Sequence, residues 1–210
     1  MKSTYEMQTQ LHNAIHKNIR CGMKERDIEK IISDICPVWE GDIVSGERCG
    51  LIGGVAQDRT LREGDTLIID IQVNSDGVWS DVTRTYFIGG ASEEVRNAYK
   101  MTLEALKNGE KVLKNGAVCE DIFAAVHGSI NSPYAFSHHA GHITGCAPFA
   151  KPSFLPGEKS TIATGNTVTL EPGIYVPDKF GIRVENNYRV TDNGAELLWD
   201  YPTDYEYFVL

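Results

Sequence analysis

The segment TLIIDIQVNSDGVWSDVTRTYFI, residues 66–88, contains two runs rich in β-branched and apolar residues on either side of NSDG. A turn sequence between two such runs is typical of a β-hairpin, with strands predicted over Thr66–Val73 and Val78–Ile88. One strand carries Asp70 and the other carries Asp81. If the strands close around a four-residue loop, Asp70 is expected to lie directly opposite Asp81.

A later segment repeats this arrangement of acids. Strands predicted over Thr167–Val176 and Gly181–Val190 flank PDKFG, and a turn centred on Asp178 places Glu171 opposite Glu185. Like charges that face each other across a ladder repel, and burial among apolar residues raises the cost. Four carboxylates in one place would raise one another's pKa values or require cations. The pattern therefore favours a site for a pair of divalent metal ions.

The two acid pairs belong to an internal duplication. The run GMKERDIEKII from Gly22 resembles GAVCEDIFAAV from Gly116, and GDTLIIDIQV from Gly64 resembles GNTVTLEPGIYV from Gly165. Each half is predicted to contain two helices followed by a hairpin, which indicates an α+β fold with two pseudo-symmetric halves. The hairpins are expected to meet near the pseudo-twofold axis. Apolar residues at helical spacing predict helices over Met7–Ile19, Asp27–Ile35, Glu93–Leu113 and Glu120–Ile130.

An oxygen-rich site with one imidazole suits Mn, Co, Fe or Zn, so the histidines are the next candidates. His142, in AGHITG just before the second acid pair, is the expected nitrogen ligand. Three others are expected at the surface of helices, and two accompany His142 in SHHAGHITG. The former are His12, His16 and His127, and the latter are His138 and His139.

Composition sets the broad class of protein. The 210 residues carry a formal charge of −9, which argues against a nucleic-acid backbone as partner. No stretch approaches the roughly 20 apolar residues of a membrane span. The five cysteines are odd in number and form no CxxC pair, which indicates reduced thiols. We expect a cytoplasmic, single-domain protein over residues 1–210.

Four segments resemble, in order, motifs of the metallopeptidase family that includes methionine aminopeptidase, prolidase and aminopeptidase P. They are IDIQVNSDGVWSDVTRTY, HHAGHITG, LEPGIYV and GIRVENNYRV. The arginine of GIRVEN makes the chain more similar to the prolidase and aminopeptidase P (Xaa-Pro) branch. The resemblance implies the pita-bread, or creatinase/aminopeptidase, fold. It also implies five metal ligands, which are Asp70, Asp81, His142, Glu171 and Glu185.

The same resemblance implies how the ligands are shared. Asp81 and Glu185 would bridge two metals, Asp70 would complete one, and His142 with Glu171 would complete the other. Two ions roughly 3.5 to 4 Å apart can hold a bridging hydroxide as nucleophile and polarise the scissile carbonyl. Glu171 could then relay a proton to the leaving amine.

Three further residues are candidates for the surroundings of the metals. Thr83 is expected to orient Asp81 by a hydrogen bond. Arg183 is expected to hold a carboxylate in a bidentate fork. His138 matches a family position that lies near substrate.

Two histidine positions depart from the family pattern, and a third position differs as well. Gly53 and Phe149 stand where the family has histidines that contact substrate, and Ile143 replaces a common glycine. Loss of a transition-state hydrogen bond can cost about a hundredfold or more in rate, so peptidase activity is expected to be weakened or altered. The separate N-terminal domain of the larger relatives is expected to be absent, and a homodimer is possible.

The sequence leaves three functions open. The first is a dinuclear metallopeptidase acting near peptide N-termini, of Xaa-Pro aminopeptidase or dipeptidase type. The second keeps the metal scaffold for a small non-peptide substrate such as an amide. The third is a binding protein without catalysis.

Overall fold

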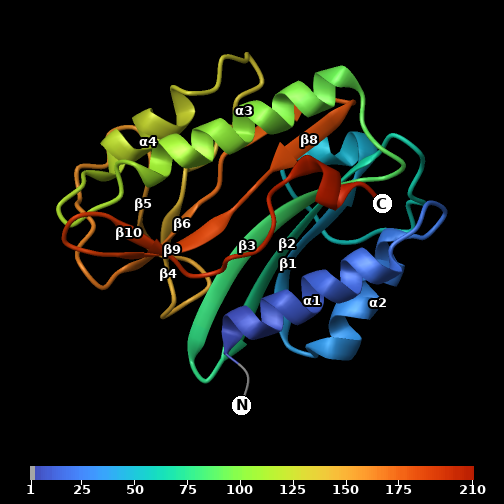
Figure 1. Ribbon diagram of the computed structural model, residues 1–210, viewed down its shortest axis with the longest axis horizontal. Coiled ribbons are helices and arrows are strands. Elements are labelled where there is room, and N and C mark those ends of the chain that lie inside the picture. Colours follow the sequence, from blue (N-terminus) through green and yellow to red (C-terminus); the bar gives the residue numbers. More distant parts are fainter. Residues whose placement is uncertain (1–2) are drawn as a thin grey trace.

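The computed structural model describes residues 3–210, and it confirms an α+β fold (Figure 1). The helices are α1 (Thr4–Asn18), α2 (Glu25–Ile35), α3 (Glu93–Glu110) and α4 (Cys119–His127), with short 3₁₀ segments η1 (Gly46–Leu51) and η2 (Tyr205–Phe208). The strands are β1 (Trp39–Ser45), β2 (Thr66–Ser75), β3 (Val78–Phe87), β4 (His142–Thr144), β5 (Ala150–Ser153), β6 (Thr167–Leu170), β7 (Gly173–Val176), β8 (Phe180–Arg183), β9 (Asn186–Val190) and β10 (Ala195–Leu197).

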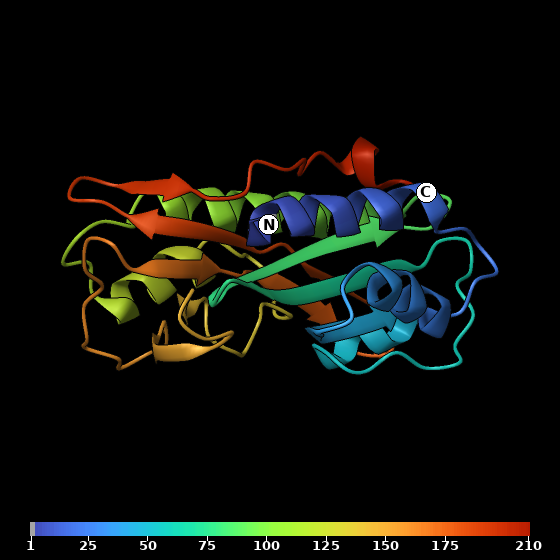
Figure 2. The same ribbon diagram turned by 90° about the horizontal axis from the view of Figure 1, so that it is seen from below.

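The strands form three antiparallel sheets, and each half of the chain has its own pair of helices packed on its strands. The first has the order β1-β2-β3, the second β10-β9-β6-β4-β5, and β7 pairs with β8. Helix α1 packs on β2 and β3, and α2 packs on β1. In the other half α3 packs on β6, β7 and β8, with α4 beside it. Helices α1 and α3 lie on the same side of the strands (Figure 2). On that side, α1 covers β2 and β3 of the first half, and α3 covers β6, β7 and β8 of the second.

The register of the first hairpin differs from the predicted one by two residues. Asp76 and Gly77 both have positive φ, 54° and 79°, which is the backbone of a two-residue turn. The strands therefore continue to the pair Ser75 and Val78. Asp70 lies opposite Thr83 rather than opposite Asp81, so the predicted facing pair is wrong. A shift of two residues keeps each side chain on its face, and both aspartates still lie on one side of the sheet.

The second hairpin has the predicted register but is interrupted. Leu170 pairs with Asn186 and Gly173 pairs with Arg183, which keeps Glu171 opposite Glu185. Pro172 has no N–H to donate, and the ladder stops on either side of it. The Glu171 N–H donates instead to the Ala140 carbonyl, and the Glu185 N–H donates to the Thr83 carbonyl at 3.0 Å. The last bond joins the two hairpins, as the symmetry predicted.

Backbone bonds repeat between the halves and confirm the duplication. Gly22 and Gly116 have φ of 91° and 79°, and each donates its N–H to a residue just before the following hairpin. Gly64 and Gly165 have φ of 84° and 90°, and each donates to the last residues of its own hairpin. Glycine tolerates positive φ at no steric cost, which accounts for its recurrence at these four positions.

The prediction that His12 lies at the surface is wrong. Its side chain is fully buried, and its Nδ1 lies 2.8 Å from the Tyr86 hydroxyl. His16 and His127 are half-buried. All five cysteines are free, and no helix among residues 3–210 is long and apolar enough to cross a membrane.

Candidate functional site

Three of the predicted ligands form a buried cluster where the two halves meet. Asp81, His142 and Glu185 place their ligand atoms within 4.8 Å of one another. They come from β3, from the start of β4 and from the break between β8 and β9. All three side chains are almost completely buried. The duplication thus brings together acids from both hairpins with one imidazole.

His142 is oriented by its own backbone. Its Nδ1 donates to the Ile143 carbonyl at 2.8 Å, so that Nε2 faces the acids. Nε2 lies 3.3 Å from Asp81 Oδ2 and 3.6 Å from Glu171 Oε1. A histidine that donates one ring N–H to a carbonyl presents the other nitrogen to a metal in a fixed direction. The geometry fits the predicted role of His142 as nitrogen ligand.

Asp70 borders the cluster and contacts an arginine. Its Oδ2 accepts a 2.8 Å hydrogen bond from Arg183 Nη2. Arg183 directs its other N–H groups to the Ile52 carbonyl, the Tyr175 hydroxyl and Thr83 Oγ1. The predicted bidentate fork is therefore wrong, because a single N–H of Arg183 holds this carboxylate.

Thr83 is a positioning residue, although not for the predicted partner. Its hydroxyl donates to Glu185 Oε2 at 2.8 Å, so the expected bond to Asp81 is wrong. Asp81 Oδ2 instead accepts from Gln72 Nε2 at 3.1 Å. The two-residue change in register places Gln72 directly across the ladder from Asp81.

Two carboxylate oxygens of the site are left for a cation to bind. Asp70 Oδ1 and Asp81 Oδ1 are buried without a hydrogen-bond partner among residues 3–210. A buried carboxylate oxygen without a donor or a cation is costly. The donor set of carboxylates with one imidazole is the kind that Mn, Co, Fe or Zn accepts. The residues present therefore fit divalent metal ions.

The pKa values of the buried acids also favour a site for cations. Burial, followed by the charge of Asp81, raises the pKa of Asp70 to about 8. Burial also raises the pKa of Asp81, and burial with the charge of Asp81 raises that of Glu185 well above its usual value. Divalent cations would favour the ionised forms of all three acids.

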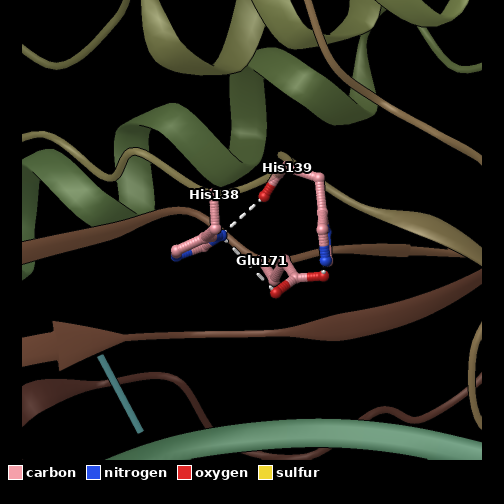
Figure 3. A group of neighbouring side chains, drawn as sticks. All are labelled: His138, His139 and Glu171. Carbon is pink, nitrogen blue, oxygen red and sulfur yellow. Dashed lines mark hydrogen bonds and ion pairs between the residues drawn. The ribbon is translucent and has the colours of Figure 1, made fainter. Parts of the chain in front are cut away.

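A second cluster adjoins the first and includes a residue that the sequence analysis did not select. His138, His139 and Glu171 group together, with His139 Nδ1 3.0 Å from Glu171 Oε1 (Figure 3). Burial alone would raise the pKa of Glu171, but the His139 contact and the nearby imidazoles lower it to about 2. His139 could have been selected from the sequence because it directly follows His138 in SHHAGH, and consecutive loop residues can lie on either side of one carboxylate.

His138 is held as a neutral imidazole. Its Nδ1 donates to the His139 carbonyl at 2.7 Å, and its Nε2 lies 3.0 Å from the Tyr175 hydroxyl. Burial lowers the pKa of His138 to about 4. Since Arg183 donates to the oxygen of Tyr175, that hydroxyl is free to donate its own hydrogen to His138. Tyr175 thus links two predicted site residues, and the sequence analysis missed it.

The two departures from the family pattern both lie at this site. The ring of Phe149 lies 4.5 Å from that of His142, and its side chain is 46% exposed. A Cβ on Gly53 would overlap the carboxylate of Asp42. Neither position offers an imidazole, in agreement with the sequence.

Comparisons with known proteins place the chain in a family. Residues 1–192 match the model of metallopeptidase family M24, and the chain belongs to this family of metal-dependent peptidases. It is 32% identical over 166 residues to a Xaa-Pro dipeptidase of Pyrococcus furiosus, a match that covers 77% of this chain and 47% of that protein. It is 33% identical over 165 residues to the putative dipeptidase YkvY of Bacillus subtilis, covering 77% of this chain and 46% of that protein.

Solved structures agree on the fold. An X-Pro aminopeptidase from Thermotoga maritima superposes with a TM-score of 0.92 at 27% identity, over 99% of this chain and 60% of that one. The prolidase from Pyrococcus furiosus superposes with a TM-score of 0.87 at 28% identity, over 95% of this chain and 62% of that one. The pita-bread fold and the prolidase branch are thereby confirmed. The chain spans about half the length of the curated relatives that it matches.

Proposed function

We propose that this chain is a metal-dependent hydrolase of the Xaa-Pro aminopeptidase or dipeptidase type. The observation that carries the proposal is the buried cluster of Asp81, His142 and Glu185 in a chain of family M24. Two curated relatives are named Xaa-Pro dipeptidases, and several neighbouring structures are prolidases. We assign the ligands as the sequence predicted, which are Asp70, Asp81, His142, Glu171 and Glu185.

A pair of Mn, Co, Fe or Zn ions would supply Lewis acidity and lower the pKa of bound water. The chain's own residues then have separable tasks. Glu171 Oε1, beside His139, is placed to accept and return a proton. Arg183 donates to Asp70 Oδ2, which favours the ionised form of Asp70 against the burial that raises its pKa. His138 presents a neutral imidazole held by Tyr175, so it can contact a substrate without adding charge.

The test is a panel of Xaa-Pro peptides with added Mn or Co. Turnover by the wild-type chain well above that of Asp81→Ala supports the proposal. A matched control is Asp34→Ala, which removes an exposed acid of α2 that is not part of the cluster. Equal turnover by wild type and Asp81→Ala would refute it.

A second candidate is hydrolysis of a small non-peptide amide on the same scaffold. It is favoured by Gly53 and Phe149, which change the groups beside the metals while leaving the cluster intact. Turnover of small amides in the absence of Xaa-Pro hydrolysis would select it. Metal binding with no turnover of either class would instead select a binding protein.

A further inference from the structure

Asp70 does face another acid across the sheet, but that acid lies on the strand that the sequence analysis did not predict. In the pairing of β1 with β2, Asp42 lies directly opposite Asp70, and Asp70 in turn lies opposite Thr83. Residues directly opposite in antiparallel strands share a face. A polar row therefore runs from Thr83, which holds Glu185, through Asp70 to Asp42 on the edge strand.

The two carboxylates of this row share a single cationic side chain. Arg183 Nη2 lies 2.8 Å from Asp70 Oδ2 and 3.8 Å from Asp42 Oδ2, so one guanidinium serves two carboxylates. The separation from Asp42 is too long for a hydrogen bond. No closer cationic partner of Asp42 occurs among residues 3–210. Its side chain is 36% exposed, whereas that of Asp70 is 14% exposed. Asp42 thus presents a poorly neutralised carboxylate at the solvent side of the site.

Gly53 makes room for this carboxylate. A Cβ at position 53 would overlap Asp42 Oδ2, so any other residue there would push the carboxylate away. Gly53 does not have positive φ, and its backbone does not require glycine. Glycine is therefore required at position 53 by the space that Asp42 occupies, not by the backbone conformation. The Asp42 carboxylate thus occupies the space that a side chain at position 53 would need. The family resemblance implies an imidazole at position 53.

We propose that Asp42 is a specificity-determining residue whose carboxylate binds a cationic group of the substrate beside the metal centre. This inference rests on the proposed function. Neighbouring strands lie about 5 Å apart, which is close to the span of one or two extended residues. A substrate bound at the metal centre beside Asp70 can therefore place an ammonium at Asp42. The ammonium can come from the free amino terminus or from a basic side chain.

The experiment measures binding without turnover, on the chain loaded with Mn, by calorimetry with three amino-alcohol probes. Norleucinol carries only the α-ammonium, Nα-acetyl-lysinol carries only the side-chain ammonium, and Nα-acetyl-norleucinol carries neither. We expect one cationic probe to bind at least about fivefold more tightly than the neutral probe, which is the strength of a partly exposed ion pair. The probe that is preferred identifies the source of the ammonium.

Three variants connect the preference to Asp42. Asp42→Asn removes the charge, and Gly53→Ala displaces the carboxylate without changing any charge. Both are expected to abolish the preference. Glu40→Gln is the matched control, because it removes an exposed acid two residues along the same strand and is expected to retain the preference. Thermal melting of each variant shows that it is folded.

The inference is overturned if the wild type binds all three probes alike or binds none of them. It is also overturned if the preference survives in Asp42→Asn. Inactivity towards Xaa-Pro peptides would refute the proposed function alone, since this binding test needs no hydrolysis.

Discussion

The two hairpins of this chain place their acids in different ways. In the first, β2 and β3 form an unbroken ladder, and Asp70 and Asp81 project from it as offset neighbours. In the second, the ladder is interrupted at Glu171 and Glu185, whose N–H groups bond to other segments. An unbroken ladder positions side chains by register, whereas an interrupted one positions them by bonds from outside.

The Glu185 N–H bond and several side-chain contacts connect one half to the other. Arg183 of the second half holds Asp70 of the first, and Thr83 of the first half holds Glu185 of the second. His142 of the second half faces Asp81 of the first. The site is therefore not the sum of two half-sites, because each half supplies groups that position the acids of the other.

The largest effect is expected from Arg183→Met, which removes the link to the first hairpin. Asp70 would then be left buried without a cationic partner at hydrogen-bond distance. Breaking a buried ion pair in this way costs about 3 kcal/mol or more, so at about pH 9, above the Asp70 pKa of about 8, the free energy of unfolding of the metal-free chain should fall by that amount. Chemical denaturation measures it. Arg189→Met, on the exposed side of β9, is the control, and an equal loss there would contradict the account.

Removal of the opposite link should weaken metal binding. Thr83→Val keeps the shape of the side chain but removes the hydrogen bond to Glu185 Oε2. Loss of such a partner typically costs about tenfold to a hundredfold in metal affinity. Thr66→Val is a matched control, because Thr66 is a buried threonine of β2 whose hydroxyl has no hydrogen-bond partner among residues 3–210. Unchanged affinity in Thr83→Val would refute the link.

The acids of the first hairpin should also make stability depend on pH. The pKa of Asp70 is raised from 3.8 to about 8, so the folded chain retains a proton that the unfolded chain releases. The metal-free chain should therefore lose stability as pH rises from about 4 to about 8, by at most about 1.4 kcal/mol per pH unit for this group. Thermal melts in a chelator measure the slope. Asp70→Asn should flatten it, and an unchanged slope would count against the buried acid.

The smallest effect concerns the turn that sets the first register. Gly77→Ala forces a side chain onto a backbone with φ of 79° and should destabilise the chain by about 1 kcal/mol. Gly157 has a similar φ of 82° but lies outside both hairpins, in the loop between β5 and β6. Gly157→Ala should cost about as much stability while leaving metal affinity unchanged. A lower metal affinity in Gly77→Ala alone would show that this turn positions Asp81.

Much of the fold followed from local patterns. The four helices lie where the apolar spacing predicted them, and the duplication anticipated the junction between hairpins. The face shared by Asp70 and Asp81 was predicted correctly even though their register was not, because alternation fixes the face and turn geometry fixes the register.

Other features depended on contacts distant in sequence. Strand β1, WEGDIVS, mixes acids and glycine without alternation, so neither it nor Asp42 was predicted. The burial of His12 depends on Tyr86, and the partner of Thr83 lies in the other half of the chain. Local periodicity contains no information about such pairings.

The most direct test is metal content after equilibration with Mn and removal of free metal, measured by mass spectrometry on the purified chain. We predict about two ions per chain for the wild type, and at most one for Asp81→Asn and for Glu185→Gln, with Glu40→Gln unchanged. No bound metal in the wild type, or equal content in all four proteins, would contradict a metal centre formed jointly by the two halves.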